Sequence, residues 1–272
     1  MKSMPKITLT TLRQMAAERR PIAMLTCYDY PMAKILAACG VCILLVGDSA
    51  ATTVLGESST LPATLDFMTI LTRAVRRGAP DVFVLGDMPF GSYPDVPTAV
   101  ANARQMLCLG GADAVKLECD RRHEPIVAAL AAAGVAVCAH LGLRPQRAAL
   151  DGGYRYQGRT EVEVERIVQD ASRMAQAGAE LILLEAVPDA VSRRVVAAVP
   201  CPVLGCGAGP SCHGHVVVLH DLLGFSERTP RFADPLADVP AVIARAARDY
   251  VAAVENRQYP APRHQYGAAA GA

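Results

Sequence analysis

One pattern recurs five times along the chain: a helix-like stretch stops at a glycine, and the short apolar run that follows ends on a titratable residue. Glycine suits the position after a helix because it adopts positive φ without strain. Apolar runs of this length are typical of strands buried on both faces of a parallel sheet. Since parallel α/β proteins bind ligands at the carboxyl ends of their strands, we expect the five end residues to converge. They are Asp48, Asp87, Glu118, His140 and Glu185, which end the segments 40–48, 78–87, 111–118, 134–140 and 178–185.

The remaining segments extend this alternation to eight strands. A first strand is expected over 22–27, a seventh over 201–205 and an eighth over 216–219. Eight strands alternating with helices in about 250 residues predict an α/β fold of the (β/α)₈ TIM barrel type. A doubly wound open sheet is the alternative. It is disfavoured because the glycines at 205–209 lack the acid expected about twenty residues later in a dinucleotide fold, and Asp221 is too near.

The length of 272 residues fits one barrel or two smaller domains. No Pro/Gly/Ser-rich linker or block of charge divides the chain. We therefore predict one domain over residues 1–266, with an N-terminal helix at 11–20 beneath the barrel and a C-terminal helix at 236–257. The arginine-rich segment 11–20 is also compatible with a transit peptide, which we favour less. The Ala/Gly tail 267–272 is expected to be disordered.

Composition excludes several classes of partner. The net charge of +1 argues against an electrostatic nucleic-acid binder. The longest nearly uninterrupted apolar stretch, 126–139, is too short to span a bilayer, so no membrane partner is expected. Nine cysteines lie mostly inside apolar runs, which favours a reducing cytoplasm. Cys39 and Cys42 have the spacing of a redox pair, but they stand at a helix end away from the expected site, so we interpret them as structural.

The residues at the strand ends suggest a metal-assisted reaction. Lys116 and Glu118 are two apart on one strand and therefore face the same side. A structural ion pair is one reading of them, and capping of the next turn is one reading of Asp48 and Asp87. Together, however, Asp48, Asp87 and Glu118 offer the oxygen ligands that Mg²⁺ prefers.

Two further strand ends carry candidates for proton transfer. Glu185 follows four apolar residues, so burial should raise its pKa, which suits a general base. A Glu bonded to local backbone is the alternative. His140 could donate to a substrate or orient a carboxylate, or simply pack in the core. The pair His213 and His215 is only a weak metal candidate.

One reaction class uses Mg²⁺, a lysine and a separate carboxylate base. A 2-oxo acid can chelate the metal through its keto and carboxylate oxygens. The metal and Lys116 would stabilise an enolate, and Glu185 would remove the proton beside the carbonyl. The enolate would then attack an electrophilic carbon.

Ten ordered motifs between about residue 6 and residue 260 resemble the ketopantoate hydroxymethyltransferase family. They are LVGDS, GESSTLP, TRAVRRGAP, DMPFGSY, GADAVKLE, AHLGLRPQ, GGYRYQGRT, LLEAVP, GCGAGP and VLHDLLGF. The resemblance implies a barrel of the phosphoenolpyruvate/pyruvate superfamily. It also implies an enzyme that transfers a hydroxymethyl group from 5,10-methylenetetrahydrofolate, as cosubstrate, to 3-methyl-2-oxobutanoate, giving 2-dehydropantoate in pantothenate synthesis through a Mg-stabilised enolate.

Carried onto matching positions, the resemblance assigns roles to individual residues. Glu185 is implied as the proton acceptor. The 2-oxo acid is expected to be held by Asp48, Ser49, Asp87 and Lys116, beside His140. Mg²⁺ is expected to be bound by Asp48, Asp87 and Glu118. Family members are typically cytoplasmic homo-oligomers, often decamers built as paired pentamers.

The sequence departs from the family pattern at Ala51, Glu57, Leu71 and His213, and none of these removes an expected catalytic group. Ala51 and Glu57 bear on the substrate pocket, so a paralogue acting on another 2-oxo acid stays an alternative. A folate-free carbon–carbon lyase of the same superfamily is a second alternative. A catalytically silent assembly partner is a third, against which the intact set of candidate residues argues.

Overall fold

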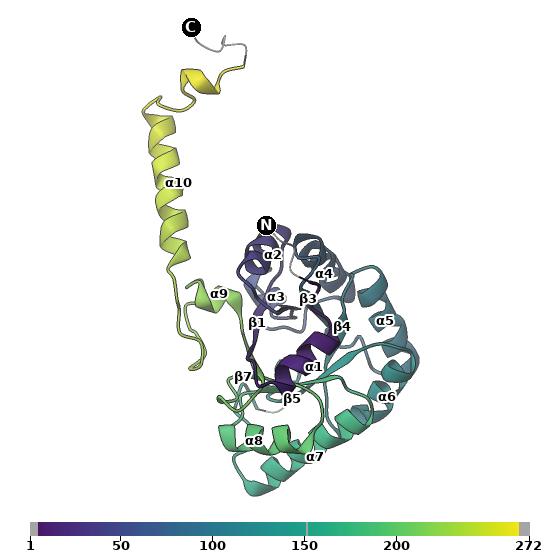
Figure 1. The fold of residues 1–272 in the computed structure, drawn as a ribbon. Helices are drawn as coiled ribbons and strands as arrows, with labels where there is room; N and C mark the ends of the chain where they lie inside the picture. The colour runs from purple at the N-terminus through teal and green to yellow at the C-terminus, as the bar shows by residue number, and fades with distance from the viewer. Residues whose placement is uncertain (1–4, 151, 267–272) are drawn as a thin grey trace. The chain divides into compact units, whose positions relative to one another are not determined.

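All eight expected strands form, and they pair in parallel and in sequence order until β8 closes onto β1 (Figure 1). This is the arrangement in the computed structural model, which describes residues 5–150 and 152–266. The prediction of a (β/α)₈ barrel is confirmed. The strands are β1 (Ile22–Thr26), β2 (Ile43–Val46), β3 (Phe83–Asp87), β4 (Ala114–Glu118), β5 (Val137–Gly142), β6 (Leu181–Glu185), β7 (Val203–Cys206) and β8 (Gly214–Val217).

Helices follow the strands and flank the barrel (Figure 1). The main barrel helices are α1 (Leu9–Ala17), α2 (Tyr30–Ala38), α4 (Leu65–Gly78), α5 (Val96–Cys108), α6 (Glu124–Ala132), α7 (Glu161–Gln176) and α8 (Asp189–Ala198). Shorter elements are α3 (Ala50–Thr53), η1 (Arg121–His123), η2 (Pro145–Arg147) and α9 (Leu219–Leu222). The C-terminal part contains α10 (Val239–Glu255) and η3 (Pro262–His264).

Local sequence explains where the helices begin. Thr64, Asp95 and Thr160 precede α4, α5 and α7, and each side-chain oxygen accepts a hydrogen bond from a backbone N–H in the first turn. Such caps satisfy backbone donors that have no partner inside the helix. The basic side chains Arg76 and Arg77 lie in the last turn of α4, where they oppose the negative end of the helix dipole.

The amino-terminal end of the barrel is filled by apolar side chains. Leu12 and Met15 of α1 are buried in one core cluster with Ile22, Ile43 and Phe83, the first residues of β1, β2 and β3. The expected N-terminal helix therefore lies under the barrel, although it spans Leu9–Ala17 instead of 11–20. Packing closes this end, so ligands are left with the opposite end of the barrel.

Several expected boundaries differ from the structure, and among them β1 ends at Thr26 and β7 begins at Val203. β8 was expected at 216–219 and forms at Gly214–Val217, because its pairing with β1 starts where Ile22 faces Gly214. Directly after β2 and Asp48, Ala50–Thr53 form the short helix α3, which we did not expect from the sequence. The hydroxyl groups of Thr52 and Thr53 both donate to the carbonyl oxygen of Ser49, which stabilises this turn.

The chain forms two compact units, one ending at Leu219 and one beginning at His220. The first contains the barrel, and the second contains α10, which begins at Val239, three residues later than the expected start at 236. The single domain over 1–266 stays a prediction, and the tail 267–272 lies outside the described residues. None of the helices in the described part of the chain is long and apolar enough to cross a membrane.

Candidate active site

Strand register brings the candidate side chains together at the carboxyl end of the barrel. Asp87 of β3 pairs with Lys116 of β4, and Glu118 of β4 pairs with His140 of β5. Asp87, Lys116, Glu118 and His140 are all buried, at 0%, 4%, 3% and 2% exposure. Buried polar groups are costly unless they are paired, so this cluster has to be explained by its contacts.

Lys116 is held between an acid and an imidazole. Its Nζ lies 2.8 Å from Oδ1 of Asp87 and 3.4 Å from Nδ1 of His140. Burial acts to lower the pKa of Lys116, but the negative charges of Asp87, Asp48 and Glu118 outweigh burial and raise the pKa. The side chain is therefore a permanent cation at the centre of the cluster, ready to attract an anionic or polarised oxygen.

Asp48 follows β2 and is connected to β3 through its backbone. The N–H of Asp48 donates to Oδ2 of Asp87 at 2.9 Å, and Asp48 itself is 5% exposed. The next residue, Ser49, is half-buried, and its Oγ lies 2.8 Å from the hydroxyl of Tyr28. The backbone of Asp48 thus contacts the Asp87–Lys116 ion pair through Asp87, whereas the hydroxyl of Ser49 contacts Tyr28.

Glu118 has one satisfied oxygen and one buried oxygen without a donor among the described residues. Its Oε1 accepts the backbone N–H of Gln146 at 3.0 Å, and its Oε2 has no hydrogen-bond partner. Burial is the main cause that raises the pKa of Glu118 to about 8. Such a carboxyl group is stabilised by gaining either a proton or a cation.

Gln146 and Tyr93 belong to the site, although we assigned neither residue a role from the sequence. Gln146 is buried in η2, where its Nε2 donates to Oδ2 of Asp48 at 2.9 Å and to the Met88 carbonyl at 3.2 Å. The hydroxyl of Tyr93 donates to Oε1 of Gln146 at 2.6 Å. This last bond fixes which end of the amide faces Asp48. The sequence signals were two of the motifs that resemble the family, AHLGLRPQ, which ends at Gln146, and DMPFGSY, which ends at Tyr93.

Glu185 and His140 form the opposite side of the cluster. Nε2 of His140 lies 3.2 Å from Oε2 of Glu185. Burial lowers the pKa of His140 well below its usual value, so the imidazole is neutral. Because the Lys116 ammonium faces Nδ1, the proton of the neutral ring belongs on Nε2, which is close to Glu185 but makes no hydrogen bond within the described residues. Burial also raises the pKa of Glu185 to about 7.

The backbone around Glu185 is tightly constrained. Ala186 has a φ of 48°, a left-handed conformation that is unusual for a residue with a side chain. Gly142, which pairs with Glu185, has a φ of 90°, and a Cβ there would lie 2.4 Å from the Glu185 carbonyl oxygen. Only glycine fits this position, so the end of β5 packs directly against the backbone that carries Glu185.

The other sequence candidates lie outside the cluster. Nδ1 of His213 accepts the backbone N–H of Val203 at 2.9 Å, a structural role that does not favour a metal site. Cys39 and Cys42 are free thiols, exposed and half-buried, at the helix end before β2. Neither position contributes to the carboxyl end of the barrel.

The donor set suits a hard divalent cation, with a restriction. Among the described residues, no three His, Cys, Asp or Glu side chains are grouped closely enough to hold a metal ion. Mg²⁺ keeps several waters and commonly uses one or two protein carboxylates, so three are not required. Asp48 and Glu118 offer oxygens for this purpose, whereas both Asp87 oxygens already face donors, Lys116 and the Asp48 N–H. The magnesium site stays a prediction.

Solved structures with the same architecture define the fold class. A phosphonopyruvate hydrolase complex with oxalate and Mg²⁺ matches with a TM-score of 0.65 and 15% identity, covering 90% of this chain and 88% of that chain. A 2,3-dimethylmalate lyase, a PEP mutase/isocitrate lyase superfamily member, matches with a TM-score of 0.59 and 19% identity, covering 95% and 89%. At these identities the likeness shows the fold alone, which is the (β/α)₈ barrel.

Sequence comparison then gives the family. The model for ketopantoate hydroxymethyltransferase matches residues 6–262, and the chain belongs to this family. A 3-methyl-2-oxobutanoate hydroxymethyltransferase of Heliobacterium modesticaldum is 42% identical, covering 96% of both chains. Another with this name from Nitrosococcus oceani is 43% identical, covering 94% of this chain and 98% of that protein. The prediction that the chain is an enzyme of this hydroxymethyltransferase type is confirmed by these relatives.

Proposed function

We propose that the protein transfers a hydroxymethyl group from 5,10-methylenetetrahydrofolate to 3-methyl-2-oxobutanoate, giving 2-dehydropantoate for pantothenate synthesis. The names of its relatives support the transferred group and the 2-oxo acid. One observation carries the proposal. Lys116, a permanent cation, and Glu185, whose pKa is about 7, lie on two sides of the neutral imidazole of His140.

Lys116 binds and polarises the 2-oxo acid in this proposal. Its ammonium provides a positive charge that is held by the carboxylate of Asp87, which also accepts the backbone N–H of Asp48. Ser49 offers a hydroxyl at the same strand end. Charge that develops on the keto oxygen when the neighbouring carbon loses its proton is therefore stabilised by a group that is fixed in advance.

Glu185 accepts the proton from the carbon beside the keto group. An unperturbed glutamate would be a weak base, but burial brings its pKa to about 7. A base with a pKa near the working pH transfers protons most efficiently. The neutral His140 stands between Glu185 and Lys116 and keeps the base oriented toward the cluster without neutralising it.

When bound, Mg²⁺ would supply charge stabilisation for the enolate and a template for the keto and carboxylate oxygens of the substrate. Asp48 and Glu118 are the residues that we assign to hold it, with Asp87 close by. The unpartnered Oε2 of Glu118 supports this assignment, because a cation would satisfy a buried carboxyl group that no donor reaches.

The carbon–carbon bond forms between the deprotonated carbon and the one-carbon unit of the folate, and both carbon–nitrogen bonds that hold this unit in the folate break. The two folate nitrogens take up the proton removed from the substrate and one proton from water. One water provides the hydroxyl oxygen of the product, and the folate leaves as tetrahydrofolate. Exclusion of bulk water from the enolate follows from the burial of Lys116, Glu118 and His140.

Cellular setting and assembly complete the proposal. Nine cysteines are free thiols in the described part of the chain, which supports a reducing cytoplasm. We also propose a homo-oligomer, a decamer as the family resemblance implies. No residue of α10 is buried within its own unit, and Val242, Ile243, Tyr250, Val251 and Val254 are exposed, which supports an intersubunit contact.

The test is formation of 2-dehydropantoate from 3-methyl-2-oxobutanoate with Mg²⁺ and methylenetetrahydrofolate. We expect product only when all three are present. Absence of product under these conditions contradicts the proposal. Carbon–carbon bond formation or cleavage on a 2-oxo acid without folate would instead favour a lyase.

A further inference from the structure

Two cavities lie beside the carboxyl ends of β4 and β5, and Arg147 lines both of them. The first has a volume of about 360 Å³ and is enclosed by Cys119 and Asp120 after β4, by the segment after β5 and by α7. This volume falls within the range of about 300 to 1,000 Å³ that is typical of small-molecule sites. The second has a volume of about 230 Å³ and includes the active-site carboxyl group of Glu118.

The first cavity, which we call the arginine cavity, carries a strong positive charge. Its lining contains five arginines and two aspartates, a formal charge of 5 − 2 = +3, although the whole chain has a net charge of only +1. An adjoining cavity adds Arg155 and Arg159 against a single acid, Glu163. The five arginines are Arg121, Arg122, Arg144, Arg147 and Arg166.

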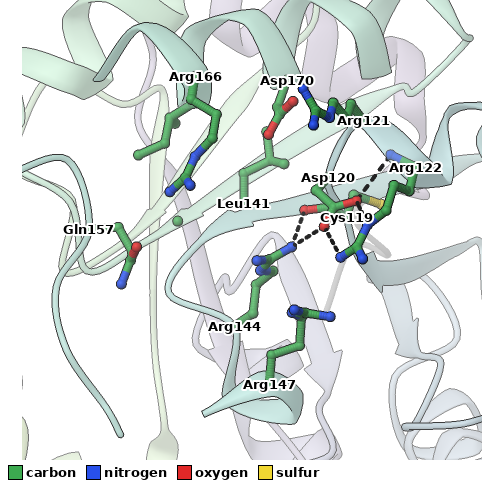
Figure 2. Close-up of a pocket in the computed structure, with 12 residues that line it drawn as sticks. Cys119, Asp120, Arg121, Arg122, Leu141, Arg144, Arg147, Gln157, Arg166 and Asp170 are labelled. Carbon is green, nitrogen blue, oxygen red and sulfur yellow. Dashed lines mark hydrogen bonds and ion pairs between the residues drawn. The ribbon is translucent and has the colours of Figure 1, made fainter. Parts of the chain in front are cut away.

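Asp120 compensates only part of this charge. Its Oδ2 is paired with Arg144 at 2.8 Å and with Arg122 at 2.6 Å. Arg166, by contrast, forms no hydrogen bond or ion pair within the described residues. Figure 2 shows Arg166 reaching into the cavity from α7, while Arg144 and Arg147 extend from the segment after β5 on the other side. Guanidinium groups in such an arrangement favour carboxylate or phosphate oxygens.

The second cavity has a different chemistry. Phe90, Tyr93 and Pro94 line it together with Glu118, and Phe90 is 56% exposed. An exposed aromatic ring beside an apolar wall suits a flat aromatic ligand. The second cavity therefore offers an aromatic compartment next to the reacting groups. The arginine cavity offers an anion-binding compartment, and Arg147 lines both cavities.

We propose that the arginine cavity binds the glutamyl carboxylates of the folate cosubstrate, while the aromatic part of the folate lies in the cavity of Phe90 and Tyr93. This inference rests on the proposed function. The assignment follows from the chemistry of the ligand. A reduced folate is an elongated molecule with a ring system at one end, which suits the aromatic cavity, and carboxylates at the other, which suit the arginine cavity. Each additional glutamate in a polyglutamyl chain adds a carboxylate that can enter a cavity lined by five arginines.

The experiment is calorimetric titration of the full-length protein with tetrahydrofolate carrying one or three glutamates, at low salt. We expect the triglutamate to bind about three- to tenfold more tightly than the monoglutamate, as additional charge-assisted contacts predict. Arg166→Gln should lose most of this gain, and Arg166→Lys should recover part of it. The matched control is Arg104→Gln, an exposed arginine of α5 that lines neither cavity and should behave as the wild type.

Equal affinity for the two folates, or an undiminished gain in Arg166→Gln, would overturn the inference. Inorganic phosphate is the competing source of anion. If phosphate binds with an Arg166-dependent affinity and does not compete with the triglutamate, the cavity is a free-anion site and the inference is wrong. The proposed function is tested apart from these titrations, by exchange of the substrate proton into D₂O in wild-type protein without folate.

Discussion

The side-chain amide of Gln146 donates a hydrogen bond to Asp48 at 2.9 Å, across 98 residues of sequence. The same residue donates its backbone N–H to Glu118 at 3.0 Å. Gln146 thus connects the two carboxylates that we assign to magnesium. Because the hydroxyl of Tyr93 fixes the amide, the NH₂ group cannot turn away from Asp48 without losing a 2.6 Å bond.

Replacing Gln146 should damage the site more than the fold. Gln146→Leu leaves Asp48 and Tyr93 without this partner, and we expect kcat/KM for the 2-oxo acid to fall about 10- to 100-fold, as for other residues that orient metal-binding carboxylates. Steady-state kinetics with varied Mg²⁺ measures the loss. Gln105→Leu is the control, since Gln105 bonds to Asp66 on the outer helices. Equal activity of Gln146→Leu and the wild type would show that the bridge has no role in positioning.

Removing only the cation of the Lys116–Asp87 ion pair should destabilise the fold much more than replacing both partners. Lys116→Met leaves the fully buried Asp87 without its cation, and we expect a loss of about 3 to 5 kcal/mol in the free energy of unfolding. The double variant Lys116→Met/Asp87→Asn should recover much of this stability and remain inactive. Denaturant titration and product formation measure the two effects.

A surface pair provides the comparison for this experiment. Arg194 pairs with Glu161 and Glu165 at exposed positions, where water screens the charges, so Arg194→Met should lower the free energy of unfolding far less than Lys116→Met. If Lys116→Met lowers the free energy of unfolding no more than Arg194→Met, the buried ion pair does not stabilise the fold as its geometry indicates.

Glu118 should make the stability of the metal-free protein depend on pH. Its pKa is about 8 in the folded state and 4.5 in the reference state. The folded state therefore favours the protonated form, and the stability that Glu118 contributes is greatest below pH 4.5 and is lost as the pH rises through 8. When a chelator is present, the free energy of unfolding of the wild type should fall between pH 4.5 and pH 8 relative to that of Glu118→Gln. Added Mg²⁺ should reduce the loss, and parallel pH profiles would contradict the assignment.

The sequence predicted those parts of the site that depend on strand register. Lys116 and Glu118 alternate on β4, and a glycine followed by an apolar run predicted where each strand ends. Asp87 and His140 therefore fall opposite them in the parallel sheet. The contacts that follow the strands were not predictable in this way, because the paths of loops depend on tertiary packing. Gln146 and Tyr93 come from such segments and bond to residues far away in the sequence.

The same distinction explains the errors at boundaries. The segment 50–63 has no apolar periodicity, and the short helix α3 forms within it through local bonds to Ser49. The start of β8 is set by its partner β1, so it appears two residues before the apolar run suggested. The titratable residues at the strand ends indicate where a reaction occurs. The family indicates which reaction it is.

Hydrogen–deuterium exchange shows whether Glu185 removes the proton beside the keto group. Wild-type protein with Mg²⁺ should exchange the C3 proton of 3-methyl-2-oxobutanoate into D₂O without folate, with a rate that rises as the pH approaches the Glu185 pKa of about 7. Glu185→Gln should still bind the 2-oxo acid, because Lys116 and Asp87 are intact, and should lose the exchange. Exchange by Glu185→Gln at the wild-type rate would show that another group is the base.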